Sequence, residues 1–207
     1  MIQSDGHRHW TDVYKAKPPT AVSWFQETPE PSLSALHRFG ASESSSLIDV
    51  GGGASNLVDA LLEEGWQDIT VLDIAAPALL AAKARLGALA DKVHWEVADI
   101  TDWQSTRRFG VWHDRAVFHF LTEPEQRAAY RLALSRAVTK GGLVIIATFA
   151  LDGPEKCSGL PVQRYDATGL AAEMGDLLQL IEGWPEEHVT PWGARQSFNW
   201  CAFRRVA

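Results

Sequence analysis

The chain has 207 residues, of which 46% are hydrophobic and 22% are charged, a composition typical of one folded domain and not of a disordered segment. Its net charge of −7 gives no reason to expect nucleic acid or an anionic membrane as a partner. No apolar run approaches the ~20 residues needed to cross a bilayer, and the first residues lack the apolar core of a secretory signal. The two cysteines show neither ligand nor disulfide spacing, so the sequence predicts a cytoplasmic protein without a metal site.

Two short helices are predicted in the first 40 residues. Residues 7–17 place Trp10 and Tyr14 on one helical face, and two prolines end this helix. Residues 32–39 form the second helix, which a glycine ends. A polar stretch then leads into the first predicted strand.

The stretch from Leu47 to Gly65 organises the rest of the chain. Residues 47–50 form the short apolar run of a buried strand, and the apolar spacing from Asn56 onward is helical. Between them, Gly51–Gly53 let the backbone turn sharply and approach a ligand without a Cβ in the way. A glycine turn between a strand and a helix N-terminus predicts a nucleotide-like ligand at the carboxyl edge of a parallel sheet.

Two ligand classes compete for this loop. A dinucleotide site requires G-x-G-x-x-G, but the third glycine position is occupied by Asn56. The alternative pattern, D-x-G-x-G-x-[GS], is matched by Asp49, Gly51, Gly53 and Ser55. With these residues the chain resembles the class I S-adenosylmethionine (SAM)-dependent methyltransferases, whose first motif has this form. The resemblance implies that the matching residues bind SAM.

Aspartates also follow the next two predicted strands. Asp73 ends the second strand, about 20 residues beyond the glycine loop, where a carboxylate can accept hydrogen bonds from both ribose hydroxyls. The resemblance likewise assigns Asp73 to the ribose and includes the adjacent Ile74 in the cofactor site. Asp99 follows the third strand, and the resemblance places it at the adenine amino group, with Ile100 packed on the ring.

An N-terminal helix often lies over the cofactor in class I methyltransferases. The resemblance therefore suggests that Trp10 and Tyr14 help to close the cofactor site. The alternative is that these aromatic side chains anchor the terminal segment to the core. On this basis the chain is one methyltransferase domain, with residues 1–40 as a helical lid and residues 45–207 as the catalytic core.

Polar residues stand out in the apolar stretch 110–121, which we predict to be the fourth strand and its exit. The resemblance puts the fourth motif here, facing the methionine part of SAM and the acceptor, and Asp114 is the carboxylate at that point. His113 and His119 are candidate general bases, because histidine exchanges protons near neutral pH. Each histidine could instead be a hydrogen-bonded packing residue.

The second half of the chain completes an α/β fold. A helix is predicted from Thr122, the K-G-G sequence at 140–142 precedes a fifth strand, and the long loop 151–165 contains Cys157 as a candidate for acceptor contact. The last strands are predicted at residues 177–182, 187–190 and 196–204, with a closing hairpin. The resemblance implies a three-layer Rossmann-like sandwich with a seven-stranded, mostly parallel sheet in the order 3-2-1-4-5-7-6.

The sequence therefore predicts a SAM-dependent methyltransferase that acts on a sulfur, nitrogen or oxygen atom of a small molecule. The exit of the fourth strand lacks the N-P-P-Y motif of amide or nucleobase N-methylation. A protein lysine methyltransferase is the alternative, because Asp114, Arg115 and Ala116 distantly resemble the D-[KR]-[GA] pattern of some members. A second alternative is a SAM-binding protein without turnover, and Asn56 disfavours a dehydrogenase.

Overall fold

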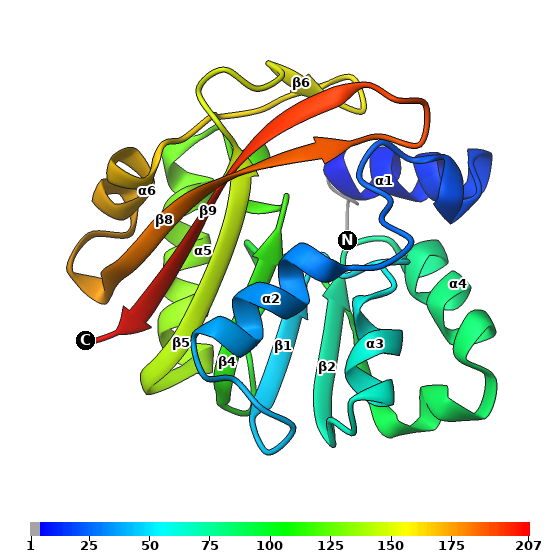
Figure 1. Cartoon of the computed structure of the whole chain (residues 1–207), viewed down its shortest axis with the longest axis horizontal. Helices are drawn as coiled ribbons and strands as arrows, with labels where there is room; N and C mark the ends of the chain where they lie inside the picture. The colour runs from blue at the N-terminus through cyan, green and yellow to red at the C-terminus, as the bar shows by residue number, and fades with distance from the viewer. Residues whose placement is uncertain (1–4) are drawn as a thin grey trace.

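The computed structural model describes residues 5–207, so the first four residues of the predicted lid lie outside the described part. Seven strands form one sheet in the order β3-β2-β1-β4-β5-β9-β8 (Figure 1). Strands β1 to β5 are parallel, and β9 pairs antiparallel with β5 and β8. The strands of this sheet are β1 Ser46–Val50, β2 Asp68–Asp73, β3 Val93–Val97, β4 Phe109–Arg115, β5 Val138–Phe149, β8 Leu178–Val189 and β9 Arg195–Arg205. The predicted fold is confirmed, since the strand order differs only in the numbers that a short extra hairpin adds.

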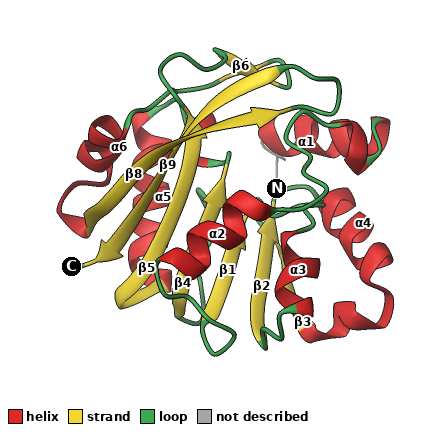
Figure 2. Cartoon of the chain, in the orientation of Figure 1, coloured by secondary structure: helices red, strands yellow, loops and turns green. Residues whose placement is uncertain are grey.

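Helices cover both faces of this sheet, which gives three layers (Figure 2). Neighbouring residues of a strand point to opposite faces, so Leu47 packs in the core beneath α2 and α3 while Ile48 packs beneath α5 and α6. Within residues 5–207, no helix is both long and apolar enough to cross a membrane. The helices are α1 Asp5–Ala16, α2 Glu30–Arg38, α3 Leu57–Glu63, α4 Ala76–Leu86, α5 Pro124–Ala137 and α6 Ala167–Met174.

Two segments lie over the carboxyl edge of the parallel strands (Figure 1). One is α1, which packs near α4. The other is the hairpin of β6 (Lys156–Cys157) and β7 (Leu160–Pro161), which forms within the predicted long loop. Ligands of open α/β sheets bind outside the carboxyl ends of the strands, so these segments lie where they can enclose a site.

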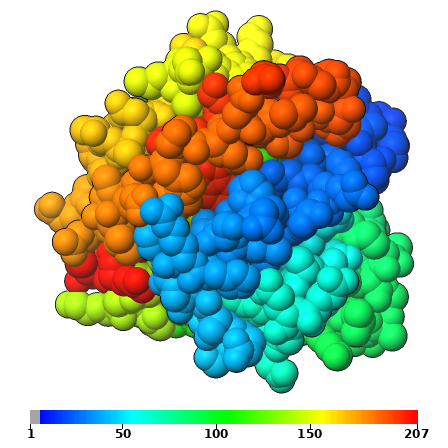
Figure 3. Space-filling model, in the orientation of Figure 1, coloured from blue at the N-terminus to red at the C-terminus, as the bar shows by residue number. Residues whose placement is uncertain are grey.

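The segment between α1 and α2 lies against the C-terminal strands, as the space-filling view shows (Figure 3). His188 Nε2 donates a hydrogen bond to the Ser23 carbonyl oxygen at 2.7 Å. Further along, Arg38 and Glu182 form an exposed ion pair at 2.5 Å. Residues from the segment before β1 and from β8 therefore meet on one face of the sheet.

The start of α5 differs from the prediction. Glu123, not Thr122, is the N-cap residue, and α5 begins at Pro124. Glu123 and Gln126 form a reciprocal capping box, in which each side chain bonds the backbone N–H of the other residue. The prediction of Thr122 as the cap was wrong because this box satisfies the free N–H groups one residue later.

The predicted boundary at the K-G-G sequence was also wrong, because β5 already begins at Val138 and runs through it. Gly141 has φ +78°, and the pairing with β4 shifts register at this point. The glycines thus make an irregularity inside a long strand and do not precede it.

The C-terminal strands are longer than predicted. The prediction broke the chain near Pro185, but β8 continues through this residue as the edge strand, paired in the described chain with β9 alone. Proline lacks an N–H group and is tolerated at an edge, where no neighbour requires that donor. The predicted hairpin turn is present, with the Thr190 N–H bonded to the Ala194 carbonyl oxygen at 2.8 Å.

Candidate active site

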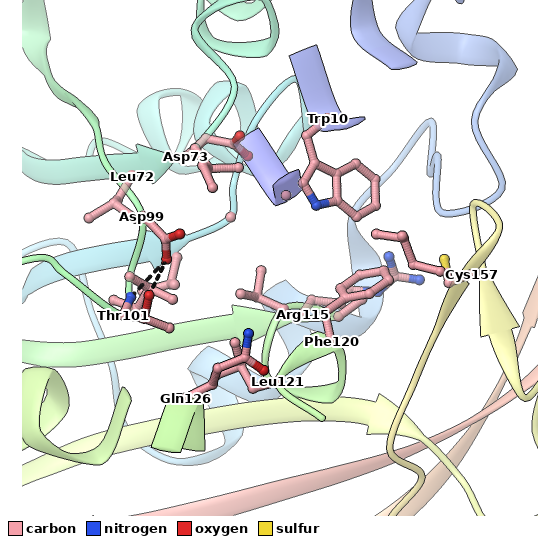
Figure 4. Close-up of a pocket in the computed structure, with 18 of the residues that line it drawn as sticks. Trp10, Leu72, Asp73, Asp99, Thr101, Arg115, Phe120, Leu121, Gln126 and Cys157 are labelled. Atoms are coloured by element: carbon pink, nitrogen blue, oxygen red, sulfur yellow. Dashed lines mark hydrogen bonds between the residues drawn. The ribbon is translucent and has the colours of Figure 1, made fainter. Parts of the chain in front are cut away.

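A pocket of about 340 Å³ opens at the carboxyl edge of the sheet (Figure 4). Its walls come from α1, the ends of β2 and β4, the segment after β3, the start of α5 and the β6–β7 hairpin. Pockets of this size and position are typical of small-ligand sites in α/β proteins.

Two aspartates lie at one end of this pocket (Figure 4). Asp73 Oδ1 accepts a hydrogen bond from the Ala75 N–H at 2.7 Å. Asp99 Oδ1 accepts bonds from both the backbone N–H and the hydroxyl of Thr101, at 3.0 and 2.7 Å. Burial raises the pKa of Asp73 to about 7, opposed by the Ala75 bond and increased by the charge of Asp49. Other predicted cofactor residues that line the pocket are Gly51, Ile74 and Ile100.

The glycine loop passes very close to its neighbours. Gly51 and Gly53 have φ values of +68° and +50°, which favour glycine. A Cβ atom on Gly51 would lie 2.0 Å from Val117 Cγ2. A Cβ on Gly53 would lie 2.8 Å from Asp73 Oδ2 and 3.0 Å from Tyr14 Oη. Gly51 lines the pocket, whereas Gly53 brings the loop close to Asp73 and α1 without being part of the lining.

Ser55 supports the loop from outside the pocket. Its hydroxyl accepts a hydrogen bond from the Leu57 N–H at 3.1 Å, at the start of α3. Its carbonyl oxygen accepts a bond from Arg85 Nη2 at 2.8 Å. The structure therefore places this predicted cofactor residue at the beginning of α3, and it lines only a smaller neighbouring pocket of about 50 Å³.

Asp49 and His113 belong to a buried chain of polar side chains. His113 Nδ1 lies 2.7 Å from Asp49 Oδ1, and His113 Nε2 lies 3.0 Å from Ser32 Oγ. All three side chains are buried, and they line the smaller pocket, not the larger one. These hydrogen bonds join α2 to the neighbouring strands β1 and β4, so the contacts are structural.

Asp114 is fully buried below the pocket. One oxygen, Oδ1, accepts a hydrogen bond from the Val117 N–H at 2.9 Å, and the other, Oδ2, accepts from Phe118 N–H at 3.2 Å and from Tyr130 Oη at 2.6 Å. Trp112 Nε1 in turn donates to Tyr130 Oη at 2.8 Å. Burial raises the pKa of Asp114 to about 6, against the lowering effect of these hydrogen bonds. The Asp114 carboxylate is held by these hydrogen bonds within the protein and does not line the pocket.

His119 is also fully buried. Its Nδ1 accepts a hydrogen bond from the Phe149 N–H at 3.2 Å. Burial, together with the nearby charge of Arg115, lowers the pKa of His119 to about 3. A histidine with this pKa is a weak base at neutral pH. None of the three predicted catalytic side chains lines the pocket, so the expected contact with an acceptor does not fit their positions.

Aromatic side chains form another wall. Trp10 of α1 meets Phe120 and Trp24 edge to face, at centroid distances of 4.9 and 5.6 Å. Tyr14 packs against Trp24 at 6.2 Å. All four residues line the pocket, which places the two predicted lid residues in its wall.

Part of the chain that forms this site is similar to a known protein family. Residues 47–142 match a family model described as "Methyltransferase domain". No curated protein matches the chain. The matched segment runs from β1 to the glycines of β5 and contains the glycine loop and both pocket aspartates.

Solved structures of similar fold extend this likeness to nearly the whole chain. The structure described with the conversion of a disulfide bond into a thioacetal group during echinomycin biosynthesis is 22% identical, with a TM-score of 0.77, over 97% of this chain and 93% of that chain. The N-methyltransferase NodS from Bradyrhizobium japonicum, in complex with S-adenosylhomocysteine (SAH), is 14% identical, with a TM-score of 0.71, over 98% and 100%. The 1,6-didemethyltoxoflavin-N1-methyltransferase from Burkholderia thailandensis is 15% identical, with a TM-score of 0.68, over 98% and 84%.

Residues 47–142 thus match a methyltransferase domain, and the sheet has the strand order of the class I, SAM-dependent methyltransferases. The match and the fold support the predicted enzyme class, with SAM as the methyl donor. Among residues 5–207 of this methyltransferase, no group of three or more His, Cys, Asp or Glu side chains could hold a metal ion.

The pocket also contains side chains that were not predicted to bind the cofactor or to act in catalysis. Arg115, Phe120 and Cys157 lie together at the end opposite Asp73 and Asp99 (Figure 4). Cys157 was a candidate because of its loop, but Arg115 entered only as part of a lysine-methyltransferase pattern. The available signal was a second charge, next to Asp114, in an otherwise apolar stretch.

Proposed function

We propose that this methyltransferase transfers the methyl group of SAM to a small-molecule acceptor. The proposal rests on the composition of the pocket wall beyond the two aspartates. There the lining is mostly aromatic and aliphatic, and the residues are Trp10, Trp24, Phe120, Leu160 and Pro161. Small-molecule sites typically combine such an apolar lining with a few well-placed polar groups.

The donor end of the pocket fits SAM. The proposed role of Asp73 is to accept hydrogen bonds from the ribose hydroxyls, and that of Asp99 is to bind the adenine amino group. Ile74 and Ile100 would pack on the adenine ring. Gly51 also lines the pocket, and its lack of a Cβ allows Val117 to approach the loop closely.

SAM supplies a methyl group already activated on a sulfonium, so the protein must chiefly align the acceptor and exclude water. No histidine lines the pocket in the described part of the chain. Burial raises the pKa of Tyr14 far above its usual value and that of Cys157 to about 11. Neither group is a base at neutral pH, which favours an acceptor whose lone pair is available without deprotonation by the protein.

The test is transfer of label from methyl-labelled SAM to extracts of the source organism. The extract is separated by ultrafiltration into small-molecule and macromolecular fractions before incubation with the purified protein. We expect label in the small-molecule fraction, lost with Asp73→Ala and retained with Asp68→Ala. Asp68 is the matched control, because it lies at the other end of β2 and outside the pocket.

Other outcomes would contradict the proposal. Label on protein would favour the lysine methyltransferase alternative. SAH binding without transfer to either fraction would favour the SAM-binding protein without turnover.

A further inference from the structure

The two ends of the pocket carry side chains of opposite charge. Asp73 and Asp99 lie at one end, and Arg115 lies at the other, beside Phe120 and Cys157 (Figure 4). The aspartates account for the donor end under the proposed function. The guanidinium at the opposite end has no role in holding the ribose or the adenine.

Arg115 has few contacts for a charged side chain in this position. Its Nη1 donates one hydrogen bond, to the Trp24 carbonyl oxygen at 3.1 Å. Its guanidinium carbon lies 4.9 Å from the centroid of the Phe198 ring. Its Nε and Nη2 atoms are buried and have no hydrogen-bond partner within residues 5–207.

No carboxylate in the described chain forms an ion pair with Arg115 within 4.0 Å. Glu186 is near enough to favour the charged guanidinium, but it already accepts hydrogen bonds from Trp200 Nε1 at 2.5 Å and Gln26 Nε2 at 3.4 Å. The Cys157 thiol, whose pKa burial raises to about 11, is neutral near pH 7. Arg115 therefore has no direct ion pair in the described chain, and the charge of Glu186 acts on it only from a longer distance.

A buried cation without a direct ion pair is unfavourable, and each buried N–H without an acceptor adds to that cost. An arginine remains protonated in such a place, because its pKa is too high for it to lose the proton. The two free nitrogens, Nε and Nη2, lie on one edge of the planar guanidinium. Their parallel N–H groups match the two oxygens of a carboxylate.

We propose that Arg115 binds a carboxylate, or a planar oxyanion of the same shape, on the methyl acceptor. The acceptor is then a small molecule with an apolar body, packed against Trp10 and Phe120, and one negative group. This inference rests on the proposed function. Protein atoms cover Nε and Nη2, so contact requires a small rotation of the Arg115 side chain.

A carboxylate could also come from the methionine part of the donor. We assign the acceptor because Arg115 lies at the end of the pocket away from Asp73 and Asp99 (Figure 4). The positive sulfonium of SAM adds to the attraction for a negative acceptor. The experiment has to measure donor and acceptor binding separately.

The experiment uses phenylacetate and phenylacetamide, which differ in charge but have nearly the same shape. Each is titrated by calorimetry into the full chain saturated with SAH, for the wild type and for Arg115→Gln, Arg115→Lys and Arg164→Gln. We expect the wild type to bind phenylacetate at least about tenfold more tightly than the amide, as for one charge-assisted pair. Arg115→Gln should abolish this preference, and Arg115→Lys should retain part of it.

Arg164→Gln is the matched control, because it removes the same charge outside the pocket and should leave the preference unchanged. The SAH affinity should stay within about threefold in all variants. Thermal unfolding of each SAH complex verifies folding, and Arg115→Lys covers the case in which Arg115→Gln does not fold.

Three results would overturn the inference. The first is equal binding of the acid and the amide, and the second is no binding of phenylacetate to the wild-type SAH complex. The third is a loss of SAH affinity in Arg115→Gln with an unchanged preference for phenylacetate, which would assign Arg115 to the donor carboxylate. A wild type that does not bind SAH would instead contradict the proposed function.

Discussion

An aspartate lies near the carboxyl end of both β2 and β4, but the surroundings of the two side chains differ. Asp73 and Asp114 are 6% and 0% exposed, and burial raises the pKa of both. Asp73 lines the pocket and has one bond to the chain beside it, whereas Asp114 is held by two backbone N–H groups and the Tyr130 hydroxyl. An aspartate at a strand end is thus available to a ligand only where the chain does not supply its partners.

The largest effect expected from this contrast is on folding. Asp114→Ala should lower the free energy of unfolding by about 3–5 kcal/mol, because Tyr130 and two N–H groups lose their buried acceptor. Urea denaturation measures this loss. The SAH affinity of the folded protein should change far less than in Asp73→Ala. A stable Asp114→Ala protein without turnover would show instead that Asp114 acts on the reacting groups.

The next effect is on donor binding. Asp73→Ala should weaken SAH binding about 100-fold, since two hydrogen bonds to a charged carboxylate are lost. Titration calorimetry measures the change, with Asp68→Ala on the same strand as the control. An unchanged SAH affinity in Asp73→Ala would contradict the assignment of Asp73 to the ribose, and with it the contrast between the two strand ends.

The pH dependence of binding sharpens the same contrast. In the folded protein the pKa of Asp73 is about 7, above the usual value of 3.8. The protonated side chain therefore contributes its full share to the free energy of unfolding below pH 4, and this contribution is lost as the pH rises through 7. Ribose hydroxyls donate to the ionised form, so SAH affinity should rise by up to about tenfold per pH unit below 7 and then level off. Calorimetry from pH 5.5 to 8.5 tests this.

Asp73→Asn is the control for the pH dependence, because it keeps the shape and removes the titration. Its SAH affinity should vary much less with pH. Without ligand, Asp73→Asn should be more stable than the wild type at pH 8, since no buried charge remains at this position. A steep pH dependence that persists in Asp73→Asn would point to another group.

The smallest effect concerns the polar chain behind the glycine loop. Ser32→Ala removes the hydroxyl that lies 3.0 Å from His113 Nε2, and it should cost about 1 kcal/mol of unfolding free energy. Because this chain lies outside the larger pocket, the preference for phenylacetate should be unchanged. Urea denaturation and the acid–amide comparison test both statements, and a lost preference would extend the acceptor site to Ser32.

The sequence was sufficient to predict the sheet and to bring two strand-end aspartates to one edge of it. Buried strands have short apolar runs, glycine turns follow them, and the carboxyl ends of parallel strands meet at one edge. For this reason Asp73 and Asp99, far apart in the chain, could be expected in one site, and the structure brings both to the pocket. The strand order was predicted from the resemblance to the class I methyltransferases.

The exit of β4 could not be interpreted in the same way. A strand covered on both faces can bury polar side chains in either direction, wherever partners exist. The partners here are remote in sequence: His113 meets Ser32, 81 residues away, and Asp114 meets Tyr130, 16 residues away. No local pattern predicts such pairs, so acid–base chemistry was assigned to groups that hold the fold together, and Arg115 was overlooked.

The proline in β8 has a consequence for how the protein behaves at high concentration. An open strand edge of 12 residues presents backbone donors and acceptors that another sheet could extend. Pro185 removes one backbone donor from this strand. Two copies meeting along β8 would therefore form a less regular ladder of hydrogen bonds, which disfavours edge-to-edge aggregation.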